Sequence, residues 1–126
     1  DGSGIYVSNG QPIIEHSTVR MLEGAEYRRE RFLVSKRQGA TSLTIKEVEL
    51  YPGYEGRMHT HPVDVAIQVT SGAVQVVVGD EIQTIRAGHT VLAPPGVPHK
   101  LINKLWTSVQ MLVTYPDTDL ETSYLE

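Results

Sequence analysis

The segment GYEGRMHTHPVDVAIQVTSG, from Gly53 to Gly72, contains two histidines followed by an apolar stretch. From Val65 onward apolar and polar residues alternate, which is the pattern of a β-strand with one buried face. His59 and His61 are two positions apart, so on an extended strand both imidazoles leave the same face. The segment therefore predicts β-structure in which two histidines point to one side of a sheet.

Short runs of this kind recur along the chain between the Gly, Pro and Asp residues that are typical of turns. The sequence predicts strands at residues 13–14, 19–22, 31–35, 43–51, 57–61, 65–70, 74–78, 81–85, 90–93, 99–103 and 108–114. Residues 23–31 are compatible with a helical turn, which Gly24 disfavours. Many short strands predict an all-β fold, a small antiparallel β-barrel, rather than βαβ units. We expect one domain, with an N-terminal arm at 1–22 that packs in a dimer, a barrel at 23–115 and a polar C-terminal tail at 116–126.

The composition restricts the classes of partner. With 11 Lys and Arg against 15 Asp and Glu residues the formal net charge is −4, whereas nucleic-acid binding needs a basic face. The densest basic cluster interleaves Arg28, Arg29 and Arg31 with Glu26 and Glu30, and we interpret it as a solvated mixed-charge segment. The chain has no cysteine, which excludes disulfides, thiolate ligands and cysteine nucleophiles. No apolar run approaches the roughly 20 residues of a membrane span, so we expect a cytoplasmic protein without nucleic-acid or membrane partners.

A third histidine follows a rigid turn. In the segment APPGVPH three prolines restrict the backbone before His99, and Gly96 permits a tight turn. Such an entry fixes the direction of the His99 ring, as a metal ligand requires. Neutral imidazoles bind Fe, Zn, Ni, Cu or Mn, which makes His59, His61 and His99 candidate ligands. The alternative is a solvated strand face at His59 and His61, which the Gly-rich turn before them and the apolar strand after them disfavour.

Two spaced motifs connect these histidines with a known family. The pattern G-x5-H-x-H-x3–4-E-x6-G is matched, apart from its glutamate, by Gly53, His59, His61 and Gly72. The pattern G-x5-P-x-G-x2-H-x3-N is matched throughout by Gly88, Pro94, Gly96, His99 and Asn103. The chain thus resembles the cupin superfamily over residues 53–103. The resemblance implies a jelly-roll barrel (a double-stranded β-helix) with a divalent transition metal, Fe, Zn, Ni or Mn, and a homodimeric assembly.

The first motif lacks its carboxylate. The glutamate position falls at Val65, or with the longer spacing at Ala66, and neither side chain can donate a lone pair to a metal. Asp64 and Gln68 are the nearby substitutes, but strand alternation points them away from the face of Val65. A bulge after Pro62 would turn Asp64 inward. We therefore predict a three-histidine site and leave Asp64 and Gln68 open as a fourth ligand.

Two further side chains are catalytic candidates. Arg57 lies two residues before His59 and, if it faces inward, would clamp a substrate carboxylate; the alternative is a solvated place at the rim. Glu47 would act as acid, base or support for a ligand, unless its strand face is exposed while Val48 and Leu50 pack inside.

These features favour a metal-dependent small-molecule enzyme with a mononuclear three-histidine site. We expect a small oxygenated or carboxylic substrate, and the reaction of a dioxygenase with iron or of a lyase or isomerase with zinc, nickel or manganese. The alternative is a non-catalytic cupin that binds or senses a small-molecule ligand. A third hypothesis is a dimerisation unit whose residues 5–22 pair with an edge strand of a second copy.

Overall fold

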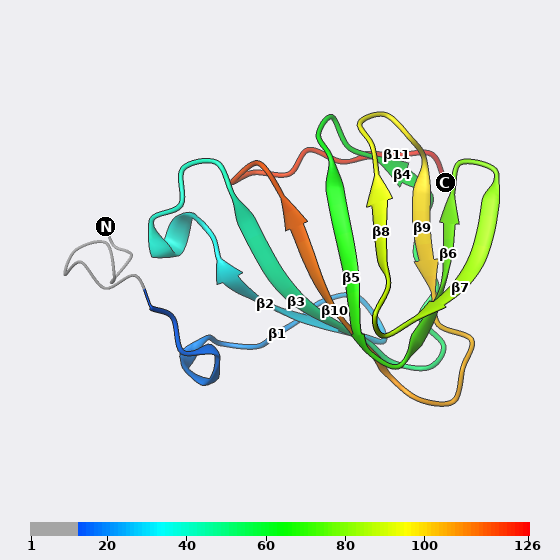
Figure 1. Ribbon diagram of the computed structural model, residues 1–126, viewed down its shortest axis with the longest axis horizontal. Helices are drawn as coiled ribbons and strands as arrows, with labels where there is room; N and C mark the ends of the chain where they lie inside the picture. Colours follow the sequence, from blue (N-terminus) through cyan, green and yellow to red (C-terminus); the bar gives the residue numbers. More distant parts are fainter. Residues whose placement is uncertain (1–12) are drawn as a thin grey trace.

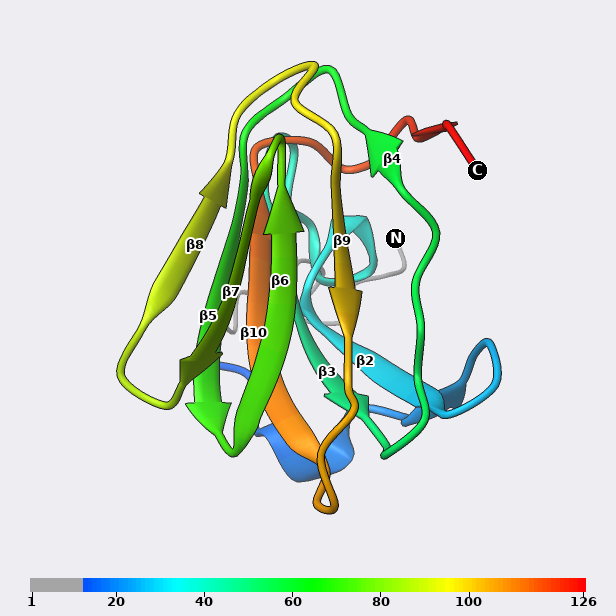
Figure 2. The ribbon, with the colours of Figure 1, turned by 90° about the vertical axis from the view of Figure 1, so that its right-hand side faces the viewer.

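The computed structural model of the protein describes residues 13–126 and consists of two facing antiparallel sheets (Figure 1 and Figure 2). In spatial order, the six-stranded sheet contains β1 (Leu22–Glu23), β2 (Arg28–Val34), β3 (Thr44–Leu50), β10 (Val109–Tyr115), β5 (Val65–Ser71) and β8 (Thr90–Ala93). The five-stranded sheet contains β11 (Ser123–Tyr124), β4 (His59–Thr60), β9 (His99–Ile102), β6 (Ala73–Val78) and β7 (Glu81–Arg86). Two short 3-10 helices, η1 (His16–Thr18) and η2 (Lys36–Gln38), precede and follow β2. The prediction of an all-β antiparallel barrel is confirmed.

Alternating apolar residues of both sheets fill the space between them. Most buried core residues come from β3, β5, β6 and β10: Val48, Leu50, Val65, Ile67, Val69, Val74, Val76, Val109, Met111 and Val113. The intervening positions of β5 and β10 are less buried or exposed, as expected for strands with one face on the core. Each apolar side chain of this size contributes roughly 1.5–3 kcal/mol when fully buried, so this core is the main force that holds the sheets together.

The turn between β5 and β6 requires glycine. Gly72 has a φ of 83°, and a Cβ atom there would lie 2.6 Å from the carbonyl oxygen of Ser108. Only glycine combines this left-handed backbone with so close an approach of another chain segment. A glycine is therefore required at the last position of the first cupin motif, because the loop that leads into β10 leaves no room for a side chain there.

The structure corrects the prediction before residue 35. Residues 13–14 form no strand, and the strand expected at 19–22 is reduced to β1. The helical turn considered for residues 23–31 is wrong, because β2 already begins at Arg28. β2 pairs with β3 along its length, and the Arg29 Nη2 atom lies 2.6 Å from Glu49 Oε1. The alternating charges of this segment therefore stabilise a strand pair rather than a helix.

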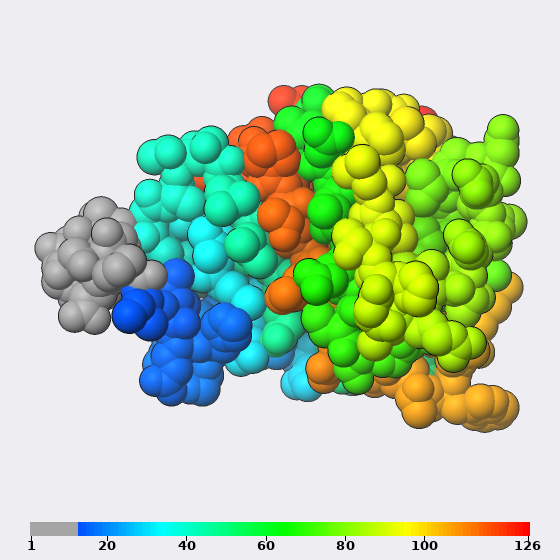
Figure 3. All heavy atoms as spheres, viewed as in Figure 1, coloured from blue at the N-terminus to red at the C-terminus, as the bar shows by residue number. Residues whose placement is uncertain are grey.

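The two ends of the described chain lie on the surface of the barrel. Residues 13–22 (blue in Figure 3) lie at one end of the molecule beside β2, where Arg31 Nη1 donates to the His16 carbonyl at 3.1 Å. The rest of the predicted arm, residues 1–12, lies outside the described residues. At the other end β11 adds an edge strand to β4. No helix in residues 13–126 has the length and apolar character needed to cross a membrane.

Candidate metal centre

Three histidines, two in the five-stranded sheet and one directly after β4, converge on one point. His59 and His99 are directly paired across β4 and β9, so their side chains leave the same face of the sheet. His61 follows two residues after His59 and joins them. The ring centroids are 4.8 Å apart for His59–His61, 4.3 Å for His59–His99 and 5.0 Å for His61–His99. One candidate ligand nitrogen from each ring lies within 4.8 Å of the other two, so the predicted ligand group is assembled.

Backbone carbonyls fix the tautomer of all three rings. The Nδ1 atoms of His59, His61 and His99 donate to the carbonyl oxygens of Arg57 at 2.6 Å, Glu121 at 2.8 Å and Val97 at 3.1 Å. A carbonyl oxygen only accepts, so each neutral ring carries its hydrogen on Nδ1 and leaves the Nε2 lone pair free. This is the arrangement in which histidine binds a metal through Nε2, while its other nitrogen is held by an outer hydrogen bond.

Burial keeps two of the rings neutral. It lowers the pKa of His99 from 6.5 to about 4, against the opposing effect of the hydrogen bond to the Val97 carbonyl. Burial likewise lowers the pKa of His61, and the bond to the Glu121 carbonyl again opposes it. Metals bind the neutral imidazole. The donor set and its protonation therefore fit a divalent transition metal.

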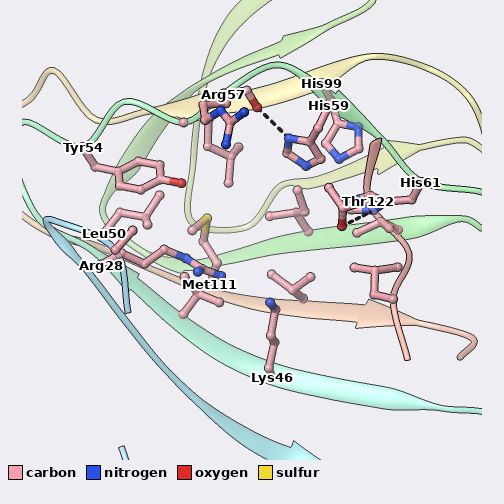
Figure 4. A pocket seen from close by; sticks show the side chains of 18 of the residues that line it. Arg28, Lys46, Leu50, Tyr54, Arg57, His59, His61, His99, Met111 and Thr122 are labelled. Carbon is pink, nitrogen blue, oxygen red and sulfur yellow. Dashed lines mark hydrogen bonds between the residues drawn. The ribbon is translucent and has the colours of Figure 1, made fainter. Parts of the chain in front are cut away.

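The histidines line a cavity of about 550 Å³ between the two sheets (Figure 4). Its walls combine polar side chains, among them the histidines, Arg28 and Lys46, with a set of apolar ones: Val48, Leu50, Val65, Ile67, Met111 and Val113. Val65, at the family's glutamate position, is 3% exposed and faces this cavity. Asp64 and Gln68 are exposed and do not line it. Among the described residues no carboxylate joins the three histidines, so the group is a three-histidine donor set as predicted.

Arg57 lines the cavity but is occupied by the C-terminal segment. Its Nε and Nη2 atoms donate to the Glu126 carbonyl oxygen at 3.0 and 2.8 Å. Its guanidinium carbon also lies 4.0 Å from the centroid of the Tyr124 ring. Arg57 is exposed. In this position it anchors the tail beside His59, and its predicted role as a substrate clamp stays a prediction.

The structure does not bring Glu47 to the histidines. On β3 the side chains of Lys46, Val48 and Leu50 line the cavity, so Glu47 between them points to the other face of the sheet. Its Oε1 atom accepts a hydrogen bond of 2.8 Å from Arg31 Nε on the outer side of the sheet. The catalytic role proposed for Glu47 is corrected accordingly: its place is in a cross-strand ion pair outside the cavity.

Sequence reasoning missed three polar groups of the site, two side chains and one backbone carbonyl. Arg28 and Lys46 line the cavity, although Arg28 was assigned to a solvated cluster. For Lys46 the signal was available, because it has the same strand parity as Val48 and Leu50, which were expected inside. The carbonyl of Glu121 was also missed, because every residue has a backbone carbonyl and the residue type does not indicate which one accepts a hydrogen bond.

The fold and site define a small antiparallel β-barrel with a three-histidine donor set at its interior. The family model for the cupin domain matches residues 46–115, more than half of the chain, and the chain belongs to the cupin family. No curated protein matches it at a significant level.

Solved structures share the fold. The polyketide cyclase RemF from Streptomyces resistomycificus superposes with a TM-score of 0.80 at 21% identity, over 90% of this chain and 84% of that chain. A cupin-superfamily sugar phosphate isomerase from Silicibacter pomeroyi gives 0.79 at 21% identity, over 91% and 82%. KdgF from a Halomonas species gives 0.74 at 18% identity, over 85% and 94%. The predicted jelly-roll barrel is confirmed.

Proposed function

We propose that the protein is a metal-dependent cupin enzyme that acts on a small oxygenated or carboxylic molecule. The ligands would be the Nε2 atoms of His59, His61 and His99. The observation that carries the proposal is that all three Nδ1 atoms donate to backbone carbonyls while the rings meet in one cavity. A solvated strand face would have no need to orient three imidazoles in the same way.

The residues around the histidines suit a reaction in a partly dry site. A bound divalent metal would supply Lewis-acid polarisation of a substrate carbonyl or, if it is iron, redox chemistry with dioxygen. Three neutral imidazoles leave the full charge of the metal uncompensated, because Val65 replaces the family's carboxylate. Buried apolar side chains such as Ile67 and Met111 form part of the wall, and beside them electrostatic contacts with a substrate are stronger than in bulk water.

The identity of the metal divides the candidate reactions. Iron would support dioxygenase chemistry, and zinc, nickel or manganese would support a lyase or isomerase. Among the neighbours of known structure, one is named a polyketide cyclase and another a sugar phosphate isomerase. Both names describe chemistry on oxygenated carbon compounds, which is the substrate class we propose.

A binding or sensor cupin is the second candidate. The observation in its favour is that the carboxylates among the cavity-lining residues, Glu26 and Glu55, are both exposed and neither belongs to the histidine group. A general acid or base beside the metal would then have to come from the substrate or from water. This candidate predicts a retained small molecule and no turnover.

The first test is the metal content of untagged protein by elemental mass spectrometry, with His99→Ala beside it. We expect near-stoichiometric metal in the wild type and loss of metal in His99→Ala. His89→Ala is the matched control, because His89 is exposed and outside the histidine group. Metal-free wild type after anaerobic reconstitution, or full metal in His99→Ala, would refute the site.

Turnover then separates the two candidates. Metal-loaded protein is supplied with a panel of diketones, thiols and hydroxy acids in air, with Fe(II) for the oxygenase branch. Oxygen consumption or product formation that disappears in His99→Ala supports the enzyme. Failure across the panel, together with a small molecule released on gentle unfolding and seen by mass spectrometry, supports the binding protein.

A further inference from the structure

A second polar group faces the histidines from the opposite sheet. The histidines come from β4, β9 and the segment after β4 in the five-stranded sheet, whereas Lys46 and Arg28 come from β3 and β2 in the six-stranded sheet. Both cations line the same cavity, with apolar side chains around them (Figure 4). The cavity therefore has a histidine end and a cationic end.

Lys46 is unusually enclosed for a lysine. Its side chain is 14% exposed, and its Nζ atom lies 3.1 Å from Glu30 Oε1 and 5.7 Å from the centroid of the Phe32 ring. Burial lowers the pKa of Lys46, and the Glu30 carboxylate opposes that shift. Enclosing an ammonium group is costly unless an anion lies beside it. A negative group of a ligand next to Nζ would offset this cost further.

One carboxylate holds both cations. Glu30 Oε1 lies 2.6 Å from Arg28 Nη2 as well as 3.1 Å from Lys46 Nζ. Within this group two positive charges and one negative charge leave a formal charge of +1, and the two carboxylates that line the cavity, Glu26 and Glu55, are exposed to solvent. Arg28 and Lys46 line the cavity, but Glu30 does not. The polar atoms that this group contributes to the cavity wall therefore belong to the two cations.

We infer that Lys46 and Arg28 form a binding subsite for the carboxylate of a small organic acid whose other end faces His59, His61 and His99. The position of that other end rests on the proposed metal-dependent function; the carboxylate subsite rests on the cavity alone. The charge of +1 on the group matches one carboxylate, whereas a phosphate dianion would leave one negative charge that the group does not compensate. The walls formed by Val48, Leu50, Met111 and Val113 suit a hydrocarbon or aromatic middle.

The test uses metal-free protein and a pair of ligands that differ only in charge, hexanoate and hexanamide. Both are titrated into protein carrying ¹³C-methyl methionine, where Met111 reports from the cavity wall and the other two methionines serve as references. We expect hexanoate to bind more tightly than hexanamide by about tenfold or more, the factor given by one charge-assisted hydrogen bond. Equal affinities, or no binding of either ligand, would overturn the inference.

Variants assign the preference to the subsite. Lys46→Met should bring the affinity for hexanoate down to that for hexanamide, whereas Lys46→Arg should keep the preference. Lys104→Met is the matched control, because Lys104 is exposed in the loop after β9. Glu30→Gln should tighten hexanoate binding, because the internal carboxylate no longer competes for the cations. A purely structural ion-pair group gives the opposite result, with Lys46→Met keeping the preference or Glu30→Gln weakening hexanoate binding.

The metal content reports on the proposed function separately. Lys46→Met is expected to keep the metal that His99→Ala loses, because Lys46 is not a ligand. Wild-type protein that prefers hexanoate but binds no metal would refute the metal-dependent function and support the carboxylate subsite. Wild-type protein that binds metal but shows no preference would refute the subsite alone.

Discussion

Asn103 links the second motif to the stability of the barrel. Its side chain is fully buried. Its Nδ2 atom donates to the carbonyls of Leu50 and Thr107, both at 3.0 Å, and its Oδ1 atom accepts from the Leu105 amide at 3.0 Å. Its backbone carbonyl also accepts from Gly53 N at 2.9 Å, at the start of the segment that leads to His59. The side-chain amide therefore joins the end of β3 to the loop after β9, and the backbone carbonyl of the same residue holds the approach to β4.

Replacing Asn103 by Ala removes the three side-chain hydrogen bonds at about 1 kcal/mol each, so we expect the free energy of unfolding to fall by about 3 kcal/mol. Asn103→Asp keeps the volume and the acceptor for Leu105 N, but loses both donors and places a carboxylate against two carbonyls. We expect it to be at least as destabilised at neutral pH and to recover partly when the carboxyl is protonated.

The measurement is urea unfolding of the metal-free protein, with exposed Lys104→Ala as the control for the same loop. A loss below about 1 kcal/mol in Asn103→Ala would refute the reasoning, because it would mean that water replaces the amide without cost. Metal content is the second readout. Folded Asn103→Ala should still bind the metal, because the polar atoms of the wild-type Asn103 side chain contact none of the histidines. Loss of metal from folded protein would contradict the purely structural role assigned to Asn103.

Three further predictions concern the site. Val65→Glu should tighten binding of a divalent metal by about tenfold or more and should destabilise the metal-free protein by about 3–5 kcal/mol, because an unpaired carboxylate is then buried; unchanged metal affinity in a chelator competition would contradict the place assigned to Val65. In metal-free protein, the folded-state pKa of His99, about 4, lies below its unfolded-state value of 6.5. The contribution of neutral His99 to the free energy of unfolding, about 3 kcal/mol, is therefore present above pH 6.5 and lost as the pH falls towards 4. Urea unfolding should show that the free energy of unfolding falls less between pH 6.5 and 4 in His99→Gln than in wild type. Deleting residues 121–126 removes the carbonyl that holds His61 Nδ1 and should weaken metal binding by about 10–100-fold; an unchanged affinity would show that the tail does not orient the ring.

The sequence was sufficient to predict the fold class and the three histidines. Spacing by two on a strand places His59 and His61 on one face whatever the details of packing, and the prolines before His99 determine where the next strand starts. The cupin motif placed Val65 at the ligand position, and alternation then pointed Asp64 and Gln68 to the other face. These are local constraints, which depend on backbone periodicity alone.

The rest of the site depends on contacts that are distant in sequence. The Glu121 carbonyl reaches His61 only because the tail returns to pair with β4. Glu47 and Lys46 were both possible inner residues of β3, and the packing of Val48 against the core decides between them. Arg28 was misassigned because a cluster of alternating charges looks solvated, whereas the strand turns every second residue towards the cavity.

The missing carboxylate and the cationic subsite are consistent with each other on electrostatic grounds. With the proposed metal bound by three neutral imidazoles, the histidine end carries +2, and the group of Lys46, Arg28 and Glu30 adds +1 at the other end. A glutamate at position 65 would neutralise one of these charges from within the protein. With Val65 in its place, that charge is left for the ligand to compensate. A unit charge pair about 4 Å apart is worth roughly 4 kcal/mol at an effective dielectric constant of about 20. An anionic ligand would therefore gain the electrostatic attraction that a glutamate at position 65 would otherwise have used. The substitution that first looks like the loss of a ligand thus favours an acidic substrate over a neutral one.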